Sequence, residues 1–513
     1  MKIAISYPPL KDIKGTPMIS QNRQYQVFSN PTYIYPMVPA YAATLLKKNG
    51  YEVFWDDAIA EELTYGEWIG RICEEKPDVI AIETKTPVIK RHWRIIDEIK
   101  ELVELENKQR CESCSQAEFC GDKEEKLKIE NWKLKIVLMG DHITALPEES
   151  LANSKVDYAL TGGDYDFMLL NLANHLAKSE PLEPGWHFRD EKGEIKNTGK
   201  FQLNHNLDDL PFIDRELTKW KLYAYENGNY KYRPGTYTMV SRDCWWRKNG
   251  GCAFCAWTTL YPQWRTQKPE KLLDEIGHLI KKYQVKEIFD DSGTFPVGKW
   301  LEDFCKGMIE RGYNKKIKFS CNMRVGALSM EQYKLMGEAS FRFILYGLES
   351  ANQNTLDRLN KGIKIDGYEE EMRIAKKAGL EPHVTCMIGY PWESYEDAKR
   401  TVDFTSKLFN RGYIDSLQGT IVIPYPGTAL YKYCKENNLL LFDDYDRYDQ
   451  RERVMKSELT DEQAKELVQG LYKSFITPKF ILKKLVSIRK IDDIKFFWRA
   501  GFKVLGHLTD FRK

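Results

Sequence analysis

The stretch 237-YTMVSRDCWWRKNGGCAFC-255 joins a short apolar strand pattern to a loop with three cysteines. Its first residues, Tyr237–Ser241, have the length and composition of a buried parallel strand. Cys252 and Cys255 can bind one metal centre, and Cys244 can fold back to them because the intervening glycine pair accepts the backbone conformations of tight turns. Three thiolates would leave one iron of a 4Fe–4S cluster open to a non-protein ligand. A structural zinc site completed by a distant residue fits these cysteines equally well.

Strand patterns alternate with helical periodicity from this stretch to residue 437. Six βα units predict a partial (β/α)6 barrel rather than a closed eightfold one. The strands are expected at Tyr237–Ser241, Glu287–Phe289, Lys316–Ser320, Phe343–Leu345, His383–Met387 and Leu417–Val422. Residues 438–513 show only helical patterns and predict a helical C-terminal extension.

The first 185 residues also alternate strand and helix patterns, which predicts a Rossmann-like, doubly wound parallel sheet. Such a sheet binds its ligand at the carboxyl ends of its strands. Its strands are expected at Lys2–Tyr7, Tyr51–Trp55, Val79–Glu83, Leu134–Met139 and Val156–Leu160. Residues 186–232 look like a hairpin and a linker. The predicted α/β chain therefore divides into residues 1–185, 186–232, 233–437 and 438–513.

The composition of the chain is balanced in charge and does not indicate a particular class of binding partner. The 513 residues include 77 Lys and Arg against 75 Asp and Glu, a formal charge of +2 that gives no reason to expect nucleic-acid binding. The N-terminus lacks the long apolar core of a signal peptide, and no run of 18 uncharged apolar residues predicts membrane insertion. We therefore expect a cytoplasmic protein whose eleven cysteines are thiols or metal ligands rather than disulfides.

Polar and glycine-containing segments follow the later barrel strands. They are Asp290–Thr294, Asn322–Val325, Gly347–Ser350 with Asn360–Gly362, Ile388–Glu393 and Pro424–Thr428. With the cysteine loop, and in this order, they resemble the radical S-adenosylmethionine superfamily and specifically its cobalamin-binding class. The resemblance implies that Cys244, Cys252 and Cys255 hold a 4Fe–4S cluster. Its open iron would take the amino and carboxylate groups of S-adenosylmethionine, whose reductive cleavage releases a 5′-deoxyadenosyl radical.

The spacing of the first two cysteines departs from the family. Seven residues separate Cys244 from Cys252 where the family has three, and Lys248 occupies the place of the expected thiol. This difference suggests a modified loop near the substrate. The longer spacing is similar to that of methylases that modify a glutamine of methyl-coenzyme M reductase.

The segment Gly140–Glu149 follows the fourth strand of the first domain and resembles the Gly-x-His-x-Thr-x-x-Pro-x-Glu pattern of the class's cobalamin-binding domain. The resemblance implies cobalamin contacts at the strand ends, from Pro8, Thr86, Gly140, His142, Thr144 and Gly162. The Asp-x-His-x-x-Gly motif of base-off ligation is absent, so the lower ligand of the cobalt stays open. The alternative is a degenerate Rossmann-like domain that binds no ligand.

The paired domains imply a C-methyltransferase that acts on an unactivated carbon, on a substrate that could be a protein or peptide, and that takes electrons from an external donor. We assign S-adenosylmethionine contacts to Arg324, Glu349 and Ser350, and we expect Tyr346 and Glu393 to line the cavity as catalytic residues. The alternatives are a non-methylating radical reaction, such as cyclisation or oxidation, and a non-catalytic corrinoid- or metal-binding protein.

Two further features are not part of this scheme. Cys111, Cys114 and Cys120 lie in a polar stretch, expected as an inserted loop over 107–128, and predict a zinc site or an auxiliary cluster whose fourth ligand is not evident. The basic, aromatic tail Lys479–Lys513 predicts an amphipathic helix that packs on the barrel or touches a protein partner, with binding to a membrane surface as the alternative.

Overall fold

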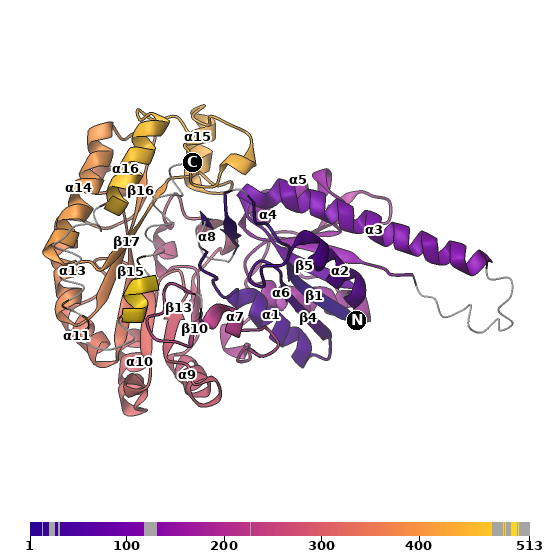
Figure 1. Ribbon diagram of the computed structural model, residues 1–513, viewed down its shortest axis with the longest axis horizontal. Helices are drawn as coiled ribbons and strands as arrows, with labels where there is room; N and C mark the ends of the chain where they lie inside the picture. The colour runs from indigo at the N-terminus through magenta and orange to yellow at the C-terminus, as the bar shows by residue number, and fades with distance from the viewer. Residues whose placement is uncertain are drawn as a thin grey trace. The chain divides into compact units, whose positions relative to one another are not determined.

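The computed structural model describes residues 1–12, 14–19, 26–28, 31–116, 131–225 and 227–473, together with 486, 488, 494–499 and 501. The chain forms two compact units, each built from several segments (Figure 1). Unit 1 consists of Met1–Leu10, Val38–Gln202 and Ile213–Lys219, and unit 2 of Lys11–Met37, Leu203–Phe212 and Trp220–Lys513.

Unit 1 is built on a seven-stranded sheet in the order β4-β1-β5-β6-β7-β8-β9. The strands are β1 (Lys2–Tyr7), β4 (Glu52–Asp57), β5 (Val79–Glu83), β6 (Lys135–Met139), β7 (Tyr158–Leu160), β8 (Trp186–Arg189) and β9 (Ile195–Asn197). Strands β1, β4, β5, β6 and β7 pair in parallel. The hairpin β8–β9 adds two antiparallel strands at the β7 edge. The predicted Rossmann-like sheet is therefore confirmed, and the hairpin is part of the same sheet.

The helices of unit 1 follow its strands. They are α1 (Met37–Lys48), α2 (Tyr65–Glu75), η1 (Thr86–Val88), α3 (Ile89–Gln116), α4 (Asp141–Ala145), α5 (Pro147–Asn153) and α6 (Tyr165–Lys178). The expected loop over 107–128 is wrong in its first part, because α3 continues to Gln116. The polar run there includes Lys, Gln, Arg and Glu, which favour helix even where the sequence shows no apolar face.

Unit 2 contains a six-stranded parallel sheet in the order β10-β13-β14-β15-β16-β17. The strands are β10 (Gly235–Thr238), β13 (Glu287–Asp290), β14 (Lys318–Met323), β15 (Phe341–Glu349), β16 (Glu381–Ile388) and β17 (Ser416–Ile421). This strand order is that of the predicted partial barrel. Two small sheets pair β2 (Thr16–Met18) with β3 (Gln26–Phe28) and β11 (Ser241–Arg242) with β12 (Arg265–Thr266).

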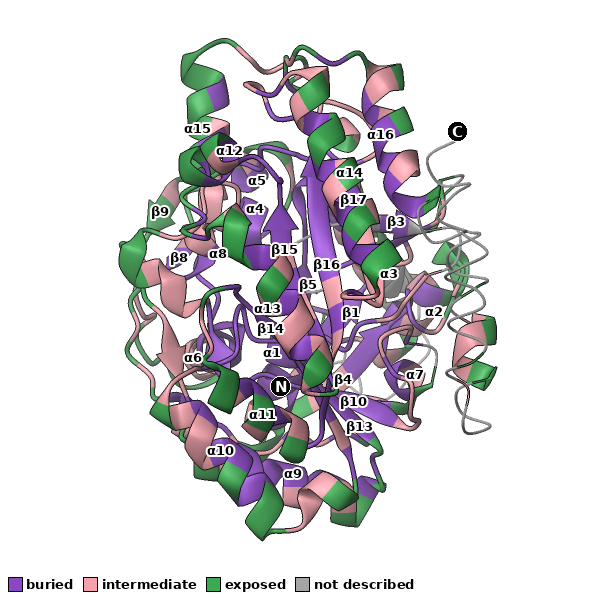
Figure 2. Cartoon of the chain, turned by 90° about the vertical axis from the view of Figure 1, so that its left-hand side faces the viewer, coloured by how far each residue is buried: buried purple, intermediate pink, exposed green. Residues whose placement is uncertain are grey.

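Amphipathic helices cover the barrel strands, and Figure 2 shows their buried and exposed stripes. They are α9 (Pro269–Tyr283), α10 (Lys299–Glu310), α11 (Met330–Glu338), α13 (Ile365–Lys377), α14 (Tyr395–Arg411) and α16 (Asp461–Lys473). Shorter helices are α7 (Lys221–Ala224), η4 (Trp245–Asn249), α8 (Trp257–Leu260), α12 (Gln353–Arg358) and α15 (Ala429–Glu436), with η3 (Leu207–Asp209), η5 (Tyr313–Lys315) and η6 (Tyr445–Arg447). A ring cluster of Phe295, Phe304, Phe319 and Phe341 fills the space between β14, β15 and α10.

Helix α16 and the segment after β1 both belong to unit 2. In α16, the Tyr472 hydroxyl donates to the carbonyl of Gly419 at 3.0 Å and so fixes the helix on β17. Lys14 Nζ donates to the buried Asp449 at 2.5 Å, and Arg451 donates to the carbonyls of Lys14 and Val27. Among the described residues, no helix is long and apolar enough to cross a membrane.

Candidate functional site

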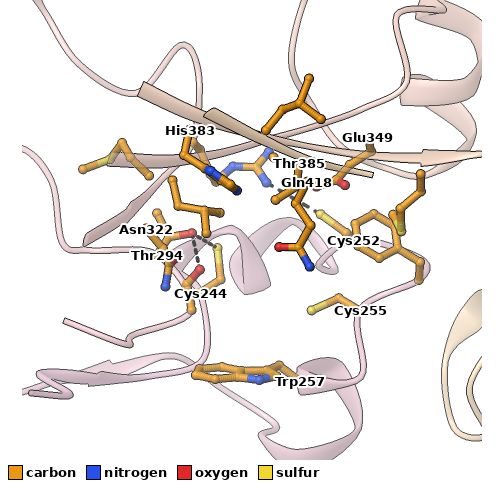
Figure 3. A pocket seen from close by; sticks show the side chains of 18 of the residues that line it. Cys244, Cys252, Cys255, Trp257, Thr294, Asn322, Glu349, His383, Thr385 and Gln418 are labelled. Carbon is orange, nitrogen blue, oxygen red and sulfur yellow. Dashed lines mark hydrogen bonds between the residues drawn. The ribbon is translucent and has the colours of Figure 1, made fainter. Parts of the chain in front are cut away.

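A cavity of about 340 Å³ lies within unit 2. Cys244, Cys252 and Cys255 line it together with side chains of the barrel strands. Figure 3 shows Thr385 and Gln418 pointing into this cavity from β16 and β17. The cysteine loop follows the first barrel strands, so the cavity lies where parallel βα folds place their sites.

The long spacing between the first two cysteines forms a turn of 3-10 helix, η4. Cys244 caps this helix and accepts a hydrogen bond from the backbone N–H of Trp246 at 3.4 Å. Gly250 and Gly251 then take positive φ angles of 89° and 75°, which lets the chain reverse toward Cys252. The extra residues therefore form ordered structure between the cysteines.

The Cys244 thiol also hydrogen-bonds the hydroxyl of Thr294, with Sγ and Oγ1 3.0 Å apart. Within the described ranges, no three Cys, His, Asp or Glu side chains are gathered closely enough to form a ready metal-binding group.

The segment after α12 fastens the cysteine loop. The Ala253 N–H donates to the carbonyl of Leu359 at 2.9 Å. The Asn360 side-chain amide donates to the carbonyls of Asn249 and Gly251 at 2.7 and 2.8 Å, and the Trp246 indole donates to the carbonyl of Asn360 at 2.7 Å. These bonds tie Asn360 of the Asn-Lys-Gly segment to the cysteine loop.

Two cationic side chains approach the cavity from this side. Arg324 Nη1 lies 3.6 Å from Cys252 Sγ, and its guanidinium stacks over the Trp246 ring with 4.4 Å to the centroid. Lys361 Nζ donates to Glu349 Oε1 at 2.8 Å, and both side chains are buried. Both side chains therefore line the cavity together with the cysteine loop.

Glu349 reaches the cavity because β15 ends irregularly. The register between β15 and β16 shifts between Gly347 and Glu349, and Glu349 has a φ of +67°. A Cβ at Gly347 would lie 2.1 Å from Glu349 Oε1, so a side chain there would displace the carboxylate. Glu349 Oε2 is buried with no hydrogen-bond partner among the described atoms. It is available to accept a hydrogen bond from a ligand.

The expectation that Tyr346 lines the cavity is wrong. Successive strand residues face opposite sides of a sheet, so Leu345 and Gly347 face the cavity and Tyr346 faces the helices. Its hydroxyl donates to the hydroxyl of Tyr333 on α11 at 3.0 Å.

Glu393 and Ser350 are likewise absent from the described cavity wall. Instead, Glu393 Oε1 accepts hydrogen bonds from the hydroxyls of Ser350 and Thr355 at 2.6 and 2.7 Å and from the Asn352 amide at 3.1 Å. Burial raises the pKa of Glu393. The carboxylate therefore holds the loop after Glu349, which corrects its expected place in the cavity.

Several residues that line the cavity belong to no motif in the sequence. On β16, His383, Thr385 and Met387 line the cavity at every second position, a period of two that the sequence contains but that does not reveal which face is functional. His383 Nδ1 lies 2.8 Å from the Ser416 hydroxyl, and burial lowers the pKa of His383 to about 4. Its imidazole is therefore neutral at physiological pH.

Unit 1 gathers most of its predicted site residues at the ends of β5, β6 and β7. The buried His142 ring contacts the Thr86 hydroxyl through Nδ1 at 3.2 Å and Glu149 through Nε2 at 3.1 Å. The Thr144 hydroxyl donates to the carbonyl of Gly140 at 2.8 Å and accepts from the N–H of Gly162 at 3.1 Å. Pro8 follows β1. Because protein groups occupy both ring nitrogens of His142, it is a poor candidate for a cobalt ligand.

The two glycines of this site are surrounded by protein. A Cβ at Gly140 would lie 2.2 Å from the carbonyl oxygen of Thr84, and one at Gly162 would lie 2.3 Å from the Phe201 ring. Gly140 and Gly162 also have φ angles of +139° and +81°. These residues must be glycine for the turns to form, and their contacts with cobalamin stay a prediction.

A buried polar group that the sequence did not reveal lies at the same strand ends. The Tyr7 hydroxyl donates to Glu83 at 2.7 Å, and Lys85 pairs with Asp141 at 3.2 Å. Burial raises the pKa of Glu83 to about 7. Asp141 occupies a variable position of the Gly140–Glu149 motif, and Tyr7 and Glu83 end apolar strand patterns, so the sequence did not single out these residues.

The second cysteine group is only partly described. Cys111 and Cys114 lie in α3, and their side chains are outside the described residues, as is Cys120. The zinc or auxiliary-cluster site remains a prediction. The tail Lys479–Lys513 also lies mostly outside the described residues.

Comparison with known proteins agrees with this geometry. Residues 240–405 match the family described as the radical SAM superfamily. An uncharacterized methyltransferase of Pyrococcus horikoshii is 26% identical over 456 residues, which cover 88% of this chain and 90% of that protein. The anaerobic magnesium-protoporphyrin IX monomethyl ester cyclase of Cereibacter sphaeroides is 24% identical, over 93% of this chain and 71% of its own.

Two solved structures share the fold of the chain. The radical S-adenosylmethionine methyltransferase TsrM from Kitasatospora setae, solved with cobalamin and a 4Fe–4S cluster, aligns over 99% of both chains with a TM-score of 0.65 and 12% identity. The cobalamin-dependent S-adenosylmethionine radical enzyme OxsB aligns over 99% of this chain and 71% of its own, with a TM-score of 0.68 and 15% identity. The predicted resemblance of the barrel to the radical SAM superfamily is confirmed over residues 240–405, and the two solved structures confirm the fold.

Proposed function

Since its barrel is a radical SAM domain, we propose that this chain is a cobalamin-dependent radical SAM C-methyltransferase that acts on an unactivated carbon. The observation that carries the proposal is one cavity lined by three loop cysteines, Arg324 and Glu349 within that domain. The Rossmann-like unit 1 and the relatives named as methyltransferases support the cobalamin and the methyl transfer.

The residues of the cavity fit the expected cofactors. When bound, a 4Fe–4S cluster with S-adenosylmethionine supplies a hydrogen-abstracting radical, and methylcobalamin supplies the methyl group. Cys244, Cys252 and Cys255 would hold the cluster, and Arg324 Nη1 lies 3.6 Å from the sulfur of Cys252. The free oxygen of Glu349 would accept a hydrogen bond from a hydroxyl or ammonium group of S-adenosylmethionine.

Two neutral polar residues of the cavity, His383 and Gln418, are suited to contact the substrate. His383 stays uncharged, and the Gln418 amide points into the cavity. Such groups can form hydrogen bonds that orient a substrate. In unit 1, Pro8, Thr86 and Thr144 would contact cobalamin, while Gly140 and Gly162 shape the turns that present them.

The substrate is assigned more broadly. The substrate could be a residue of a protein or peptide. A glutamine of methyl-coenzyme M reductase stays a hypothesis that rests on the seven-residue spacing between Cys244 and Cys252. The similarity to a cyclase over 93% of the chain favours a second candidate, a non-methylating radical reaction on the same cofactors.

The proposal is tested under anaerobic conditions. The chain is reconstituted with iron, sulfide and cobalamin and given dithionite and methyl-deuterated S-adenosylmethionine, and mass spectrometry follows 5′-deoxyadenosine. We expect deoxyadenosine from the parent and none from Cys252→Ala, while Cys73→Ala, which removes a half-buried cysteine of α2, behaves like the parent. Deuterated methyl in the product of a candidate substrate would support methyl transfer. Product without it would favour the second candidate.

A further inference from the structure

The cavity of unit 2 contains a second buried oxygen, besides that of Glu349, that lacks a hydrogen-bond partner. It is Oε1 of Gln450, a residue that lies shortly after η6 and is 5% exposed. Among the described residues that line the cavity, only Glu349 and Gln450 have such an atom. The Glu349 oxygen has a proposed role toward S-adenosylmethionine, and the Gln450 oxygen has none yet. A buried acceptor without a partner destabilises the fold, and a ligand that donates a hydrogen bond to it removes this cost.

Gln450 is held in the cavity wall by the residues on either side of it. The Asp449 carboxylate accepts a hydrogen bond from Lys14 Nζ at 2.5 Å. The Arg451 guanidinium donates to the carbonyls of Lys14 and Val27 at 2.7 and 2.9 Å. Gln450 itself has a φ of +68°, a strained conformation for a residue other than glycine, and such strain persists only where the surrounding contacts fix it. The bonds of Asp449 and Arg451 therefore fix the backbone that carries this amide.

A second side-chain amide, that of Gln418 on β17, faces the same cavity (Figure 3). Gln418 is half-buried, and its side chain forms no hydrogen bond within the described part of the chain. It lies opposite Thr385 in the parallel register of β16 and β17, and Thr385 lies opposite Gly347 on β15. Because neighbouring strands are about 4.8 Å apart, Gln418 lies roughly 10 Å across the sheet from Gly347. This distance leaves room for one ligand at Glu349, beside Gly347, and for another at Gln418.

The charges of the cavity are distributed unevenly over its described wall. The ionised side chains that line it are those of Asp243, Arg324, Glu349 and Lys361. None of these four residues lies on β16 or β17. The polar cavity residues of these two strands are His383, with its neutral imidazole, Thr385, Ser416 and Gln418. A charged group buried against β16 and β17 would lose its hydration without gaining a counter-charge, so this part of the wall selects an uncharged polar group.

We propose that Gln418 and Gln450 bind an uncharged carboxamide group of the substrate. This inference rests on the proposed function, which makes the occupant of the cavity a methyl acceptor. A carboxamide has an N–H donor and a carbonyl acceptor at the same spacing as a glutamine side chain, so two such groups pair through two hydrogen bonds. A carboxylate offers no donor to Gln450 Oε1, and a hydroxyl group offers one donor instead of two. Peptide bonds and the side chains of asparagine and glutamine carry this group, so the inference favours a protein or peptide substrate.

The test measures the binding of small probes to the full chain reconstituted with iron, sulfide and cobalamin. Saturation-transfer difference NMR gives the Kd of pentanamide, pentanoate and hexan-1-ol, which are equal in size and differ in their polar end. Gln450→Leu and Gln418→Leu each remove one amide from the cavity. Their matched control, Gln263→Leu, makes the same change at an exposed residue outside the described cavity wall. Equilibrium dialysis measures S-adenosylmethionine binding by the same four proteins, because adenine also pairs with glutamine amides.

We expect the parent to bind pentanamide about tenfold or more tightly than pentanoate or hexan-1-ol. Each cavity variant should bind pentanamide about fivefold more weakly than the parent, the loss of one hydrogen bond, and Gln263→Leu should match the parent. S-adenosylmethionine binding should be equal in all four proteins.

Three probe results would overturn the proposal: no pentanamide binding by the parent, equal affinity for the three probes, or unchanged pentanamide binding in a folded cavity variant. A loss of S-adenosylmethionine binding in Gln450→Leu would also overturn it, because this amide would then belong to the cofactor site. Urea unfolding checks each variant, and Gln418→Leu, at a half-buried strand position, decides the result if Gln450→Leu does not fold. Failure of the parent to form deoxyadenosine with dithionite would instead count against the proposed function, and the probe measurements would still stand.

Discussion

Arg324 lies against Cys252, with 3.6 Å between Nη1 and Sγ, and also donates to the carbonyl of Lys361. A hydrogen bond to a charged group contributes about 1.5–3 kcal/mol. We therefore expect Arg324→Gln to retain the cluster roughly tenfold or more weakly than the parent, measured as bound iron and sulfide after dialysis against a chelator. Arg411→Gln, at the exposed end of α14, should retain the parent's content. Full retention by Arg324→Gln would show that the contact does not contribute to cluster binding.

The buried pair Glu349–Lys361 leads to a second prediction. Lys361→Met leaves an unpaired carboxylate, and breaking a buried pair costs about 3–5 kcal/mol. The double variant Glu349→Gln/Lys361→Met removes both charges and should recover most of that loss. Urea unfolding of the two variants and the parent measures the effect. Equal stability of Lys361→Met and the double variant would contradict the prediction. It would mean that water solvates the Glu349 carboxylate once its partner is removed.

Glu83 makes stability depend on pH. Burial raises the pKa of its carboxyl from 4.5 to about 7, so between these values the folded chain keeps the proton and the unfolded chain loses it. The parent should therefore lose about 3 kcal/mol relative to Glu83→Gln as the pH rises through this window. Denaturant unfolding of both proteins at several pH values gives the difference, in which the shifts of other groups cancel. A constant difference would contradict the raised pKa.

Gly140 and Gly50 offer a matched pair of substitutions. Both have positive φ, but a Cβ at Gly50 meets nothing within 4 Å, whereas one at Gly140 meets the Thr84 carbonyl. Gly50→Ala should cost about 1–2 kcal/mol, the backbone strain alone. Gly140→Ala should cost clearly more and should weaken cobalamin binding, measured by absorbance titration. Equal costs for the two variants would mean that the turn after β6 relaxes.

The fold follows from the sequence where strands are buried on both faces. β1 and β5 coincide with the apolar runs Lys2–Tyr7 and Val79–Glu83, because such strands give continuous apolar patterns. The end of α3 was missed, since a helix without an apolar face resembles a polar loop in sequence.

The cavity was predicted in its cysteines and less well in its walls. The cysteines, Arg324 and Glu349 belong to local motifs, which a single sequence can show. Tyr346 and Glu393 were misplaced because the direction of a side chain depends on strand pleating and on partners far along the chain, such as Ser350 for Glu393, 43 positions away. His383 and Gln418 carry no motif at all.

The contact of Lys14 with Asp449 spans 435 positions of one chain. During synthesis, the segment that follows β1 therefore emerges from the ribosome long before its partners exist, and it must wait until nearly the whole chain has been translated. Unit 1 can assemble its sheet in the meantime, because all of its strands lie before residue 198. In a nascent chain halted before residue 449, unit 1 could be folded while the segment after β1 would still lack its partner residues. That segment could then be bound by chaperones or cut by proteases.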